Sequence, residues 1–296
     1  MNTQELKKWP FPSEAFLGRG SFGNVSRGLY GTSVAVKELL TGQDQMVEVR
    51  KQAKAELLHE IGILMEYRHP NIVCMIAYDS RFIVMDLYEG NAKNLKSLDE
   101  VAVVGRDCMR SIAYMHLHGK CVVHGDIKPE NILVNIDTYG VIAKAALGDV
   151  GLTRLYTRFM KQKAFTGTPG YMPMPNPVIH STHDVFALAV SLLDAFVGSN
   201  PGEVHARNDD HGIADNTAYA LARVPDGAIQ KVIYDMLAVY GNGAVRNNKD
   251  KDKGDFLRHI IVQWDYVVTS RNVSAPKIKS NALNGQGYTR TMSMSM

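Results

Sequence analysis

The chain has 296 residues, of which 45% are hydrophobic and 21% are charged. This composition is that of a globular protein and excludes a disordered, collagen-like or coiled-coil chain. Its 33 Lys and Arg residues against 30 Asp and Glu residues leave a net charge of only +3, whereas a dedicated nucleic-acid binder must neutralise many phosphates. We therefore expect no specific nucleic-acid partner.

Cysteine usage and apolar runs predict a soluble protein of a reducing compartment. Cys74, Cys108 and Cys121 are odd in number and form no Cys-x-x-Cys pair, which favours small buried side chains over disulfides or a zinc site. No segment resembles a signal peptide, and the most apolar run, 185–197, is too short to span a membrane. We expect an intracellular protein, cytoplasmic or nuclear, without a membrane partner. The sequence predicts no oligomeric state.

Glycine, β-branched and aromatic residues alternate at the start of the chain and predict a small antiparallel sheet. A turn at Tyr30, Gly31 and Thr32 separates the first two expected strands, and two apolar runs further on are typical of a second strand pair. The expected strands are residues 23–30, 32–39, 72–78 and 81–88.

Helical spacing of apolar residues interrupts and then follows these strands, which predicts a mainly helical second half. The first expected helix, residues 43–67, ends before Pro70, because proline disfavours helix in the residue that precedes it. The apolar face of this helix would combine Leu57, Leu58, Ile61, Leu64 and Met65, and the later expected helices are residues 101–118, 185–197, 213–223, 228–240 and 256–268.

Two polar segments flank the last expected helix. Residues 246–255 alternate charges without apolar residues, which indicates a solvated loop. Asp250 and Asp252 make only a poor calcium loop, because Ile261 stands where a bidentate Glu is required. From Thr269 the sequence is rich in Ser, Asn and Thr and predicts a flexible tail. This tail is basic and holds Arg271, Lys277, Lys279 and Arg290 without an acid.

The first strand region contains a glycine motif, G-x-G-x-x-G-x-V. Glycines at such positions let backbone amides approach phosphate oxygens without obstruction. A dinucleotide-binding fold would require a helix after the last glycine, but residues 25–30 have the pattern of a strand. The motif alone is weak evidence. Its residues are Gly18, Arg19, Gly20, Ser21, Phe22, Gly23, Asn24 and Val25.

Lys37 ends a Val-Ala-Val-Lys segment and shares one strand face with Ala35, so it can reach a nucleotide held beneath the glycine hairpin. The plain alternative is an exposed strand lysine. A buried ammonium needs an anionic partner, and the following helix offers Glu56 and Glu60 one turn apart. We favour Glu60 as the partner and keep Glu56 as the alternative.

The most informative motif lies in residues 121–135, where an apolar strand delivers Asp126, Lys128 and Asn131 in a short loop. This loop resembles the catalytic loop of the eukaryotic protein kinase family, H-R-D-x-K-x-x-N. Residues 147–151 resemble the metal-binding D-F-G of that family. The glycine and lysine motifs precede both in the order typical of the family.

The resemblance implies an α+β, two-lobed kinase fold with ATP and Mg²⁺ bound between the lobes. The short helical lobe and relaxed motifs also resemble those of kinases encoded by large DNA viruses, which would place the protein in a host cell. The implied kinase domain is residues 14–268, with a small β-rich N-lobe at 14–88, a larger mainly helical C-lobe at 91–268, and a flexible basic tail at 269–296.

The resemblance also implies roles for single residues. Asp126 would accept or orient the proton of the substrate hydroxyl, and Lys128 would support the transferring phosphoryl group. Asn131 and Asp149 would hold magnesium. Phosphoryl transfer spreads negative charge over phosphate oxygens, so the site must supply fixed cations and in-line positioning.

Residues 84–88 resemble the segment that joins the two kinase lobes. Met85 would border the adenine pocket, and the backbone of Asp86 and Tyr88 would hydrogen-bond the adenine edge. Without the other motifs, this segment would be interpreted as a plain strand end. The apolar residues implied above and below the ring are Val25, Ala35 and Leu133.

Three further polar residues have implied supporting roles. Asp184 matches the family's buried aspartate that binds backbone amides of the catalytic loop, and a buried aspartate without partners would be costly. His124 is expected to be a core packing residue rather than a base. His116 matches a common helix-end residue, and we do not expect it to bind metal.

The sequence departs from the family pattern at three positions. Gly125 replaces the arginine of H-R-D, which removes a cation that pairs with a phosphorylated activation loop. Val150 replaces the phenylalanine of D-F-G in a packed column with His124 and Leu64. Asn176 stands where the acid of A-P-E is usual.

The favoured function is transfer of the ATP γ-phosphate to Ser or Thr hydroxyls of protein substrates. Lys128, two residues after Asp126, together with Thr168, resembles the serine/threonine branch of the family. The main alternative is a pseudokinase that acts as a nucleotide-binding or interaction module. A small-molecule phosphotransferase is disfavoured, because the loop at residues 167–172 suits an extended peptide.

Overall fold

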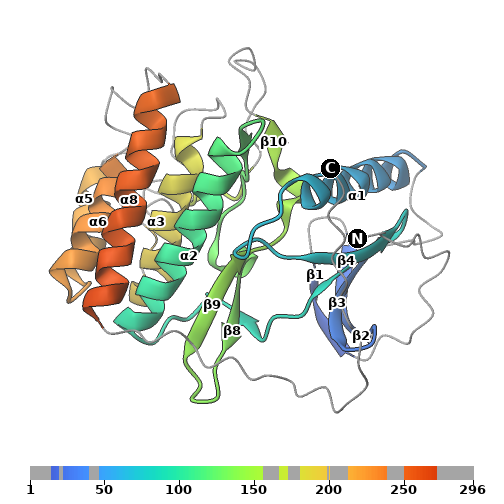
Figure 1. Ribbon diagram of the computed structural model, residues 1–296, viewed down its shortest axis with the longest axis horizontal. Helices are drawn as coiled ribbons and strands as arrows, with labels where there is room; N and C mark the ends of the chain where they lie inside the picture. The colour runs from blue at the N-terminus through green and yellow to red at the C-terminus, as the bar shows by residue number, and fades with distance from the viewer. Residues whose placement is uncertain are drawn as a thin grey trace, which may run out of the picture.

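The computed structural model describes residues 15–19, 23–39, 47–155, 167–172, 181–198, 200, 213–238 and 250–271. The chain forms two lobes, a sheet with one long helix beside it and a mainly helical lobe (Figure 1). The larger hydrophobic core runs through both lobes, from Leu57 and Ile83 in the first to Trp264 in the second. The predicted α+β, two-lobed fold is confirmed.

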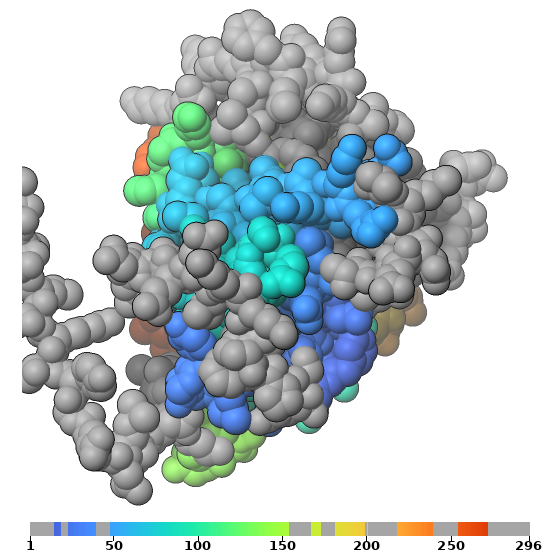
Figure 2. Space-filling view, turned by 90° about the vertical axis from the view of Figure 1, so that its right-hand side faces the viewer, coloured from blue at the N-terminus to red at the C-terminus, as the bar shows by residue number. Residues whose placement is uncertain are grey.

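The first lobe is built on an antiparallel sheet with strand order β1-β2-β3-β5-β4. Helix α1, Val47–Glu66, lies next to β4 at one edge of this sheet (Figure 2). The predicted strand pairs are confirmed, and residues 43–46 of the predicted helix lie outside the described residues. The strands are β1 Ala15–Arg19, β2 Gly23–Leu29, β3 Ser33–Leu39, β4 Met75–Asp79 and β5 Phe82–Asp86.

The predicted apolar face of α1 is only partly correct. Leu57, Ile61 and Leu64 are buried, whereas Leu58 and Met65 are 47% and 43% exposed. Each residue of a helix is rotated by about 100° from the one before it, so Leu58 and Met65 lie to one side of the stripe formed by the buried residues. The buried face is therefore narrower than the sequence pattern indicated.

The second lobe combines short strands around the catalytic loop with a group of helices (Figure 1). Ser97 caps helix α2 by accepting a hydrogen bond from the Glu100 amide at 3.2 Å, so the helix begins three residues before its predicted start. The helices are α2 Leu98–Leu117, α3 Thr182–Val197, α5 Ile213–Ala222, α6 Gly227–Ala238 and α8 Asp250–Ser270; the short elements are β6 Gly90–Asn91, β7 Val122–Val123, η1 Pro129–Asn131, β8 Ile132–Ile136, β9 Ile142–Leu147, η2 Val150–Leu152 and β10 Arg154–Leu155.

The predicted loop at residues 246–255 is wrong where the structure describes it, because α8 begins at Asp250. The first turn contains no apolar residue, so helical periodicity in the sequence could not mark this start. The helical backbone also excludes a calcium loop. At its other end α8 continues to Ser270, and Arg271 pairs with Asp99 at 2.7 Å and Asp226 at 2.6 Å, so the predicted tail begins too early.

The structure tests two predictions, that the cysteines are buried and that no helix spans a membrane. Cys108 is buried and Cys121 is half-buried, but Cys74 is exposed, so the prediction of small buried thiols is wrong for Cys74. Among the described residues, no helix has both the length and the apolar character needed to cross a membrane.

Helices α2 and α8 pack closely because Gly105 faces the fully buried ring of Trp264. A Cβ at Gly105 would lie 2.6 Å from this ring, and neither helix backbone can yield without losing other contacts. We expect Gly105→Ala to lower the free energy of unfolding by about 1–2 kcal/mol, measured by urea denaturation, because overpacking outweighs the better helix propensity of Ala.

Gly62 of α1 provides the matched control. It is exposed, and a Cβ there would meet nothing within 4 Å. Gly62→Ala should therefore stabilise the protein by about 0.5–1 kcal/mol. Equal changes in the two variants would contradict the close packing of α2 on α8.

Candidate active site

A pocket of about 300 Å³ lies between the sheet and the catalytic loop. Residues from both lobes line it, including Leu17 of β1 and Gly148 after β9. The sequence prediction had assigned many of these residues to ATP or metal binding, and the structure brings them to one cavity. Those that line it are Gly18, Val25, Ala35, Lys37, Glu60, Met85, Asp86, Tyr88, Asn131, Leu133 and Asp149.

The glycine motif is placed only in part. Gly18 lines the pocket, and Arg19 ends β1. Gly20, Ser21 and Phe22 lie outside the described residues. Gly23 does not line the pocket; it begins β2, where a Cβ would collide with the carbonyl of Glu38 in the paired strand. Close strand packing therefore explains this glycine without a ligand.

Lys37 is a buried cation held by two carboxylates. Its Nζ lies 2.7 Å from Glu60 Oε2 and 2.8 Å from Asp149 Oδ1, and the residue is only 3% exposed. Burial favours a lowered pKa for Lys37, but the carboxylates outweigh it and hold the pKa above its usual value. Glu60, rather than the alternative Glu56, is thus the partner, and Lys37 is not an exposed strand lysine.

Glu60 is itself fully buried on α1. Burial raises the pKa of this carboxyl group, and the charge of Lys37 offsets that rise only in part. The ion pair therefore depends on both partners, because either charge alone would be costly in this environment.

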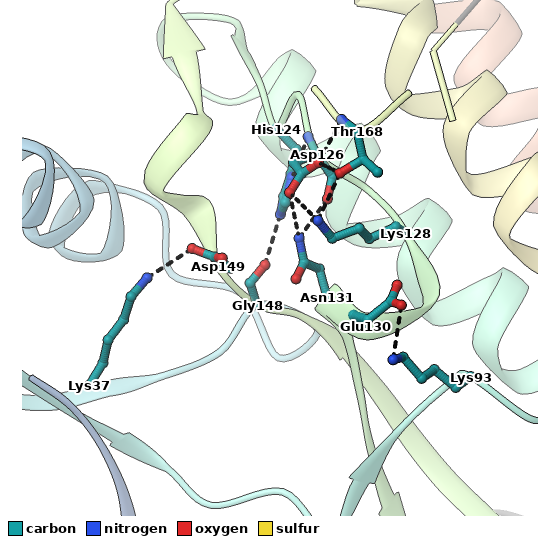
Figure 3. A network of polar contacts seen from close by, with 10 residues as sticks. All are labelled: Lys37, Lys93, His124, Asp126, Lys128, Glu130, Asn131, Gly148, Asp149 and Thr168. Atoms are coloured by element: carbon teal, nitrogen blue, oxygen red, sulfur yellow. Dashed lines mark hydrogen bonds and ion pairs between the residues drawn. The ribbon is translucent and has the colours of Figure 1, made fainter. Parts of the chain in front are cut away.

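Both oxygens of the Asp126 carboxylate are contacted by hydrogen-bond donors. Oδ1 accepts from the Thr168 amide at 3.1 Å and the Thr168 hydroxyl at 2.6 Å. Oδ2 accepts from Asn131 Nδ2 at 3.0 Å and pairs with Lys128 Nζ at 2.9 Å. Figure 3 shows these side chains converging on Asp126. The residue is 6% exposed, so the carboxylate has a fixed orientation; it does not line the 300 Å³ pocket itself but holds Asn131, which does.

Thr168 was not assigned a contact with the catalytic residues from the sequence. Its hydroxyl donates to Asp126 and accepts from Lys128 Nζ at 2.8 Å. The loop at residues 167–172 is therefore tied directly to the catalytic loop. The motif Gly-Thr-Pro-Gly-Tyr was the only sequence signal for this contact.

Asn131 and Asp149 offer oxygen atoms, the donor chemistry that Mg²⁺ prefers. Asn131 Nδ2 donates to the Asp126 carbonyl at 2.8 Å, which directs the amide oxygen of Asn131 away from Asp126 (Figure 3). Asp149 has φ 52°, in the left-handed region that is unusual for a non-glycine residue. This conformation aims its carboxylate at Lys37. Both residues fit a magnesium-binding role.

The segment joining the lobes has limited hydrogen-bonding capacity for a ligand. The Asp86 amide already donates to the Cys74 carbonyl at 3.0 Å, so Asp86 retains only its carbonyl oxygen for an adenine edge. Opposite this segment, Leu133 lies against Gly148, where a Cβ would come within 2.8 Å of the leucine side chain. The sequence analysis did not recognise that this glycine sets the depth of the pocket floor.

Asp184 supports the catalytic loop from beneath. Its Oδ2 accepts from the His124 amide at 2.8 Å and its Oδ1 from the Gly125 amide at 3.0 Å, as predicted. His116 Nε2 lies 2.8 Å from Oδ2, a buried contact that the sequence analysis missed. Burial favours a raised pKa for Asp184, but the contact with His116 and the loop amides hold its pKa below the usual value.

His124 is fully buried, as predicted for a packing residue, and is also hydrogen-bonded. Its Nδ1 accepts from the Asp126 amide at 3.3 Å, and its Nε2 lies 3.1 Å from the Gly148 carbonyl. Both ring nitrogens of His124 thus have a backbone partner. His124 therefore links the catalytic loop to the segment that carries Asp149.

The structure accommodates two of the three departures from the family pattern, and the third lies outside the described residues. Gly125 has φ 83°, a conformation that glycine adopts without cost. Val150 is fully buried in the common core with Leu64 and Met75, so the smaller side chain is enclosed. Asn176 lies outside the described residues.

Similar proteins were found among kinases of several eukaryotes. The chain is 28% identical to serine/threonine-protein kinase PAK mbt of Drosophila melanogaster over 61% of this chain and 30% of that protein. It is 29% identical to an Aurora kinase of Dictyostelium discoideum over 72% of this chain and 58% of that protein. It is also 29% identical to serine/threonine-protein kinase D2 of Rattus norvegicus over 73% of this chain and 25% of that protein. The aligned part is thus less than two thirds of each relative.

The protein kinase domain family matches residues 11–257, which include both walls of the pocket. The match extends over the glycine motif, Lys37, the catalytic loop and Asp149, the same features that the structure brings together. With most of its length matched and this geometry at its centre, the chain belongs to the protein kinase family.

Proposed function

We propose that this protein transfers the γ-phosphate of ATP to serine and threonine hydroxyls of protein substrates. The observation that carries the proposal is the arrangement of Asp126, whose carboxylate is held by Lys128, Asn131 and Thr168, with Asn131 itself lining the nucleotide-sized pocket. A carboxylate fixed in this way can orient a substrate hydroxyl and receive its proton.

The opposite wall supplies positive charge for the phosphates. Lys37 is held by Glu60 and Asp149 so that its ammonium stays at one place in the pocket. Fixed cations stabilise the charge that develops on phosphate oxygens and cost no reorganisation at the moment of transfer. Asn131 and Asp149 would hold Mg²⁺, which would supply further positive charge to stabilise the phosphates.

The loop at residues 167–172 supports the choice of a hydroxyl acceptor on a protein. Thr168 joins this loop to both Asp126 and Lys128, so an extended segment lying on the loop would place its acceptor beside the catalytic carboxylate. The serine/threonine kinases among the similar proteins support the same acceptor class.

The test is transfer of label from γ-labelled ATP and Mg²⁺ to three peptides that differ only in a Ser, Thr or Tyr acceptor. We expect label on the Ser and Thr peptides and none when the metal is chelated. Label on the Tyr peptide alone would contradict the acceptor class. Stabilisation by ATP in a thermal-shift assay without transfer to any acceptor would instead identify a pseudokinase.

A further inference from the structure

An exposed ion pair lies beside the catalytic loop. Lys93 Nζ is 3.0 Å from Glu130 Oε1, and the two side chains are 58% and 41% exposed. Glu130 sits in η1 between Lys128 and Asn131, so it is part of the segment that presents the catalytic residues (Figure 3). The mechanism proposed above does not use this pair.

The backbone holds both partners in place. The Ala92 amide lies 3.2 Å from the Pro129 carbonyl and 2.9 Å from the Ile132 carbonyl, which ties the loop of Lys93 to both ends of η1. The Lys93 amide also donates to Asn91 Oδ1 at 3.2 Å. The backbones that carry the two charges are therefore tied together beside the catalytic loop, unlike those of a pair formed by two separate loops.

Glu130 also acts toward the loop that would carry the acceptor. Burial raises the pKa of the Tyr171 hydroxyl, with Asp194 as a further cause and Glu130 as a smaller one, which places Glu130 within electrostatic reach of that loop. Tyr171 donates to Asp194 Oδ2 at 2.5 Å. Glu130 thus pairs with Lys93 and also contributes to the electrostatic environment of Tyr171.

An exposed ion pair of this kind adds little stability, about 0–1 kcal/mol. It nevertheless changes what a substrate meets at this point. A substrate arginine at Glu130 would be repelled by Lys93, and a substrate glutamate at Lys93 would be repelled by Glu130, so the pair offers little net attraction to either charge. Each intramolecular partner competes at a high effective concentration because its backbone is fixed nearby.

We infer that the Lys93–Glu130 pair is a charge filter, which makes the enzyme favour protein segments with an uncharged residue at the position that contacts the pair. The inference rests on the proposed kinase function and names its substrate class. Lys93 and Glu130 are specificity-determining residues here, not catalytic ones, because their contacts are with each other and not with Asp126.

The test compares four proteins: wild type, Lys93→Met, Glu130→Gln and the double variant. Each is assayed on serine peptides in which one residue, from four before to four after the acceptor, is Ala, Arg or Glu. Lys231→Met is the matched control, since Lys231 also forms an exposed ion pair, at 2.9 Å with Asp235 within α6.

We expect wild type to use the Ala, Arg and Glu peptides with kcat/KM values within about threefold of one another. In Lys93→Met, the kcat/KM for the Arg peptide divided by that for the Ala peptide should rise about fivefold at one or two peptide positions. The change should come mainly from KM, and its size follows because an exposed charge pair is worth about 1 kcal/mol. Glu130→Gln should raise the ratio of Glu to Ala peptide in the same way. The double variant should return to the wild-type pattern, and both gains should shrink at about 0.5 M salt.

Peptide binding measured by fluorescence anisotropy, with a non-hydrolysable ATP analogue present, gives a second readout that needs no turnover. If Lys93→Met tightens Arg-peptide binding while no protein transfers phosphate, the filter stands and the kinase function fails. If phosphate transfer occurs but neither single variant changes the kcat/KM ratio of the charged peptide to the Ala peptide, the filter is wrong and the kinase function stands. A tenfold preference of wild type for Arg, or the same shift in Lys231→Met, would also overturn the filter.

Discussion

Replacing Asp126 by Asn is expected to lower kcat for transfer to a serine peptide by about 1,000-fold or more, since both the proton acceptor and its orientation are lost. Donors contact both carboxylate oxygens, namely Thr168 on Oδ1 and Lys128 and Asn131 on Oδ2. Whichever way the new amide turns, its NH₂ group faces donors. The measurement is single-turnover transfer at saturating ATP, which separates the chemical step from product release.

Asp137 provides the isosteric control. It is a half-buried residue before a turn, and its Oδ1 accepts from the Tyr139 amide at 2.8 Å and the Val141 amide at 3.0 Å. Asp137→Asn removes the same charge by the same change of atoms and should keep kcat within about twofold of wild type. A comparable loss in both variants, or near-native transfer by Asp126→Asn, would contradict the role of Asp126.

The sequence was sufficient to predict the residues that phosphate chemistry requires. Lys37 and Glu60 could be paired because a buried ammonium needs an anion and the helix offered only Glu56 and Glu60 at suitable spacing. The family resemblance placed Asp184 under the catalytic loop, and the cost of a buried carboxylate without donors supported that placement. Such predictions succeed when burying a charged side chain costs free energy that only a few possible partners can offset.

The features that sequence reasoning missed depend on how distant segments approach one another. His116 reaches Asp184 from α2, and Thr168 reaches Asp126 from a loop about forty residues later in the chain. Neither contact has a periodic pattern, because each joins single residues of separate elements. The start of α8 was missed for a different reason, since its first turn contains no apolar residue and its stability comes from the later packing of Trp264.

Replacing Lys37 by Met is expected to have two separable effects. Transfer should fall by about 100-fold or more, because the fixed cation of the phosphate site is lost. The protein should also lose about 3 kcal/mol of unfolding free energy near neutral pH, because Glu60, 1% exposed, keeps a buried charge without its lysine. Lys37 is therefore expected to serve the stability of the fold as well as the nucleotide site.

The stability lost in Lys37→Met should depend on pH, because the pKa of Glu60 is raised. Burial already raises this pKa above that of the unfolded chain, and removing Lys37 takes away the charge that opposes the rise. A carboxyl group with a raised folded-state pKa stabilises the fold below its unfolded pKa and loses that contribution as the pH rises through the folded value. The stability deficit of Lys37→Met should thus be largest near pH 8 and shrink toward pH 5, measured by urea denaturation at each pH.

The double variant Lys37→Met/Glu60→Gln distinguishes the two effects. Gln removes the buried charge and nearly preserves the shape of Glu60, so most of the lost stability should return and the pH dependence of the deficit should disappear. Transfer should remain as low as in Lys37→Met, because no cation is restored to the pocket. Recovery of transfer together with stability would mean that Lys37 acts only through folding; a deficit that persists unchanged at every pH would mean that Glu60 is not its source.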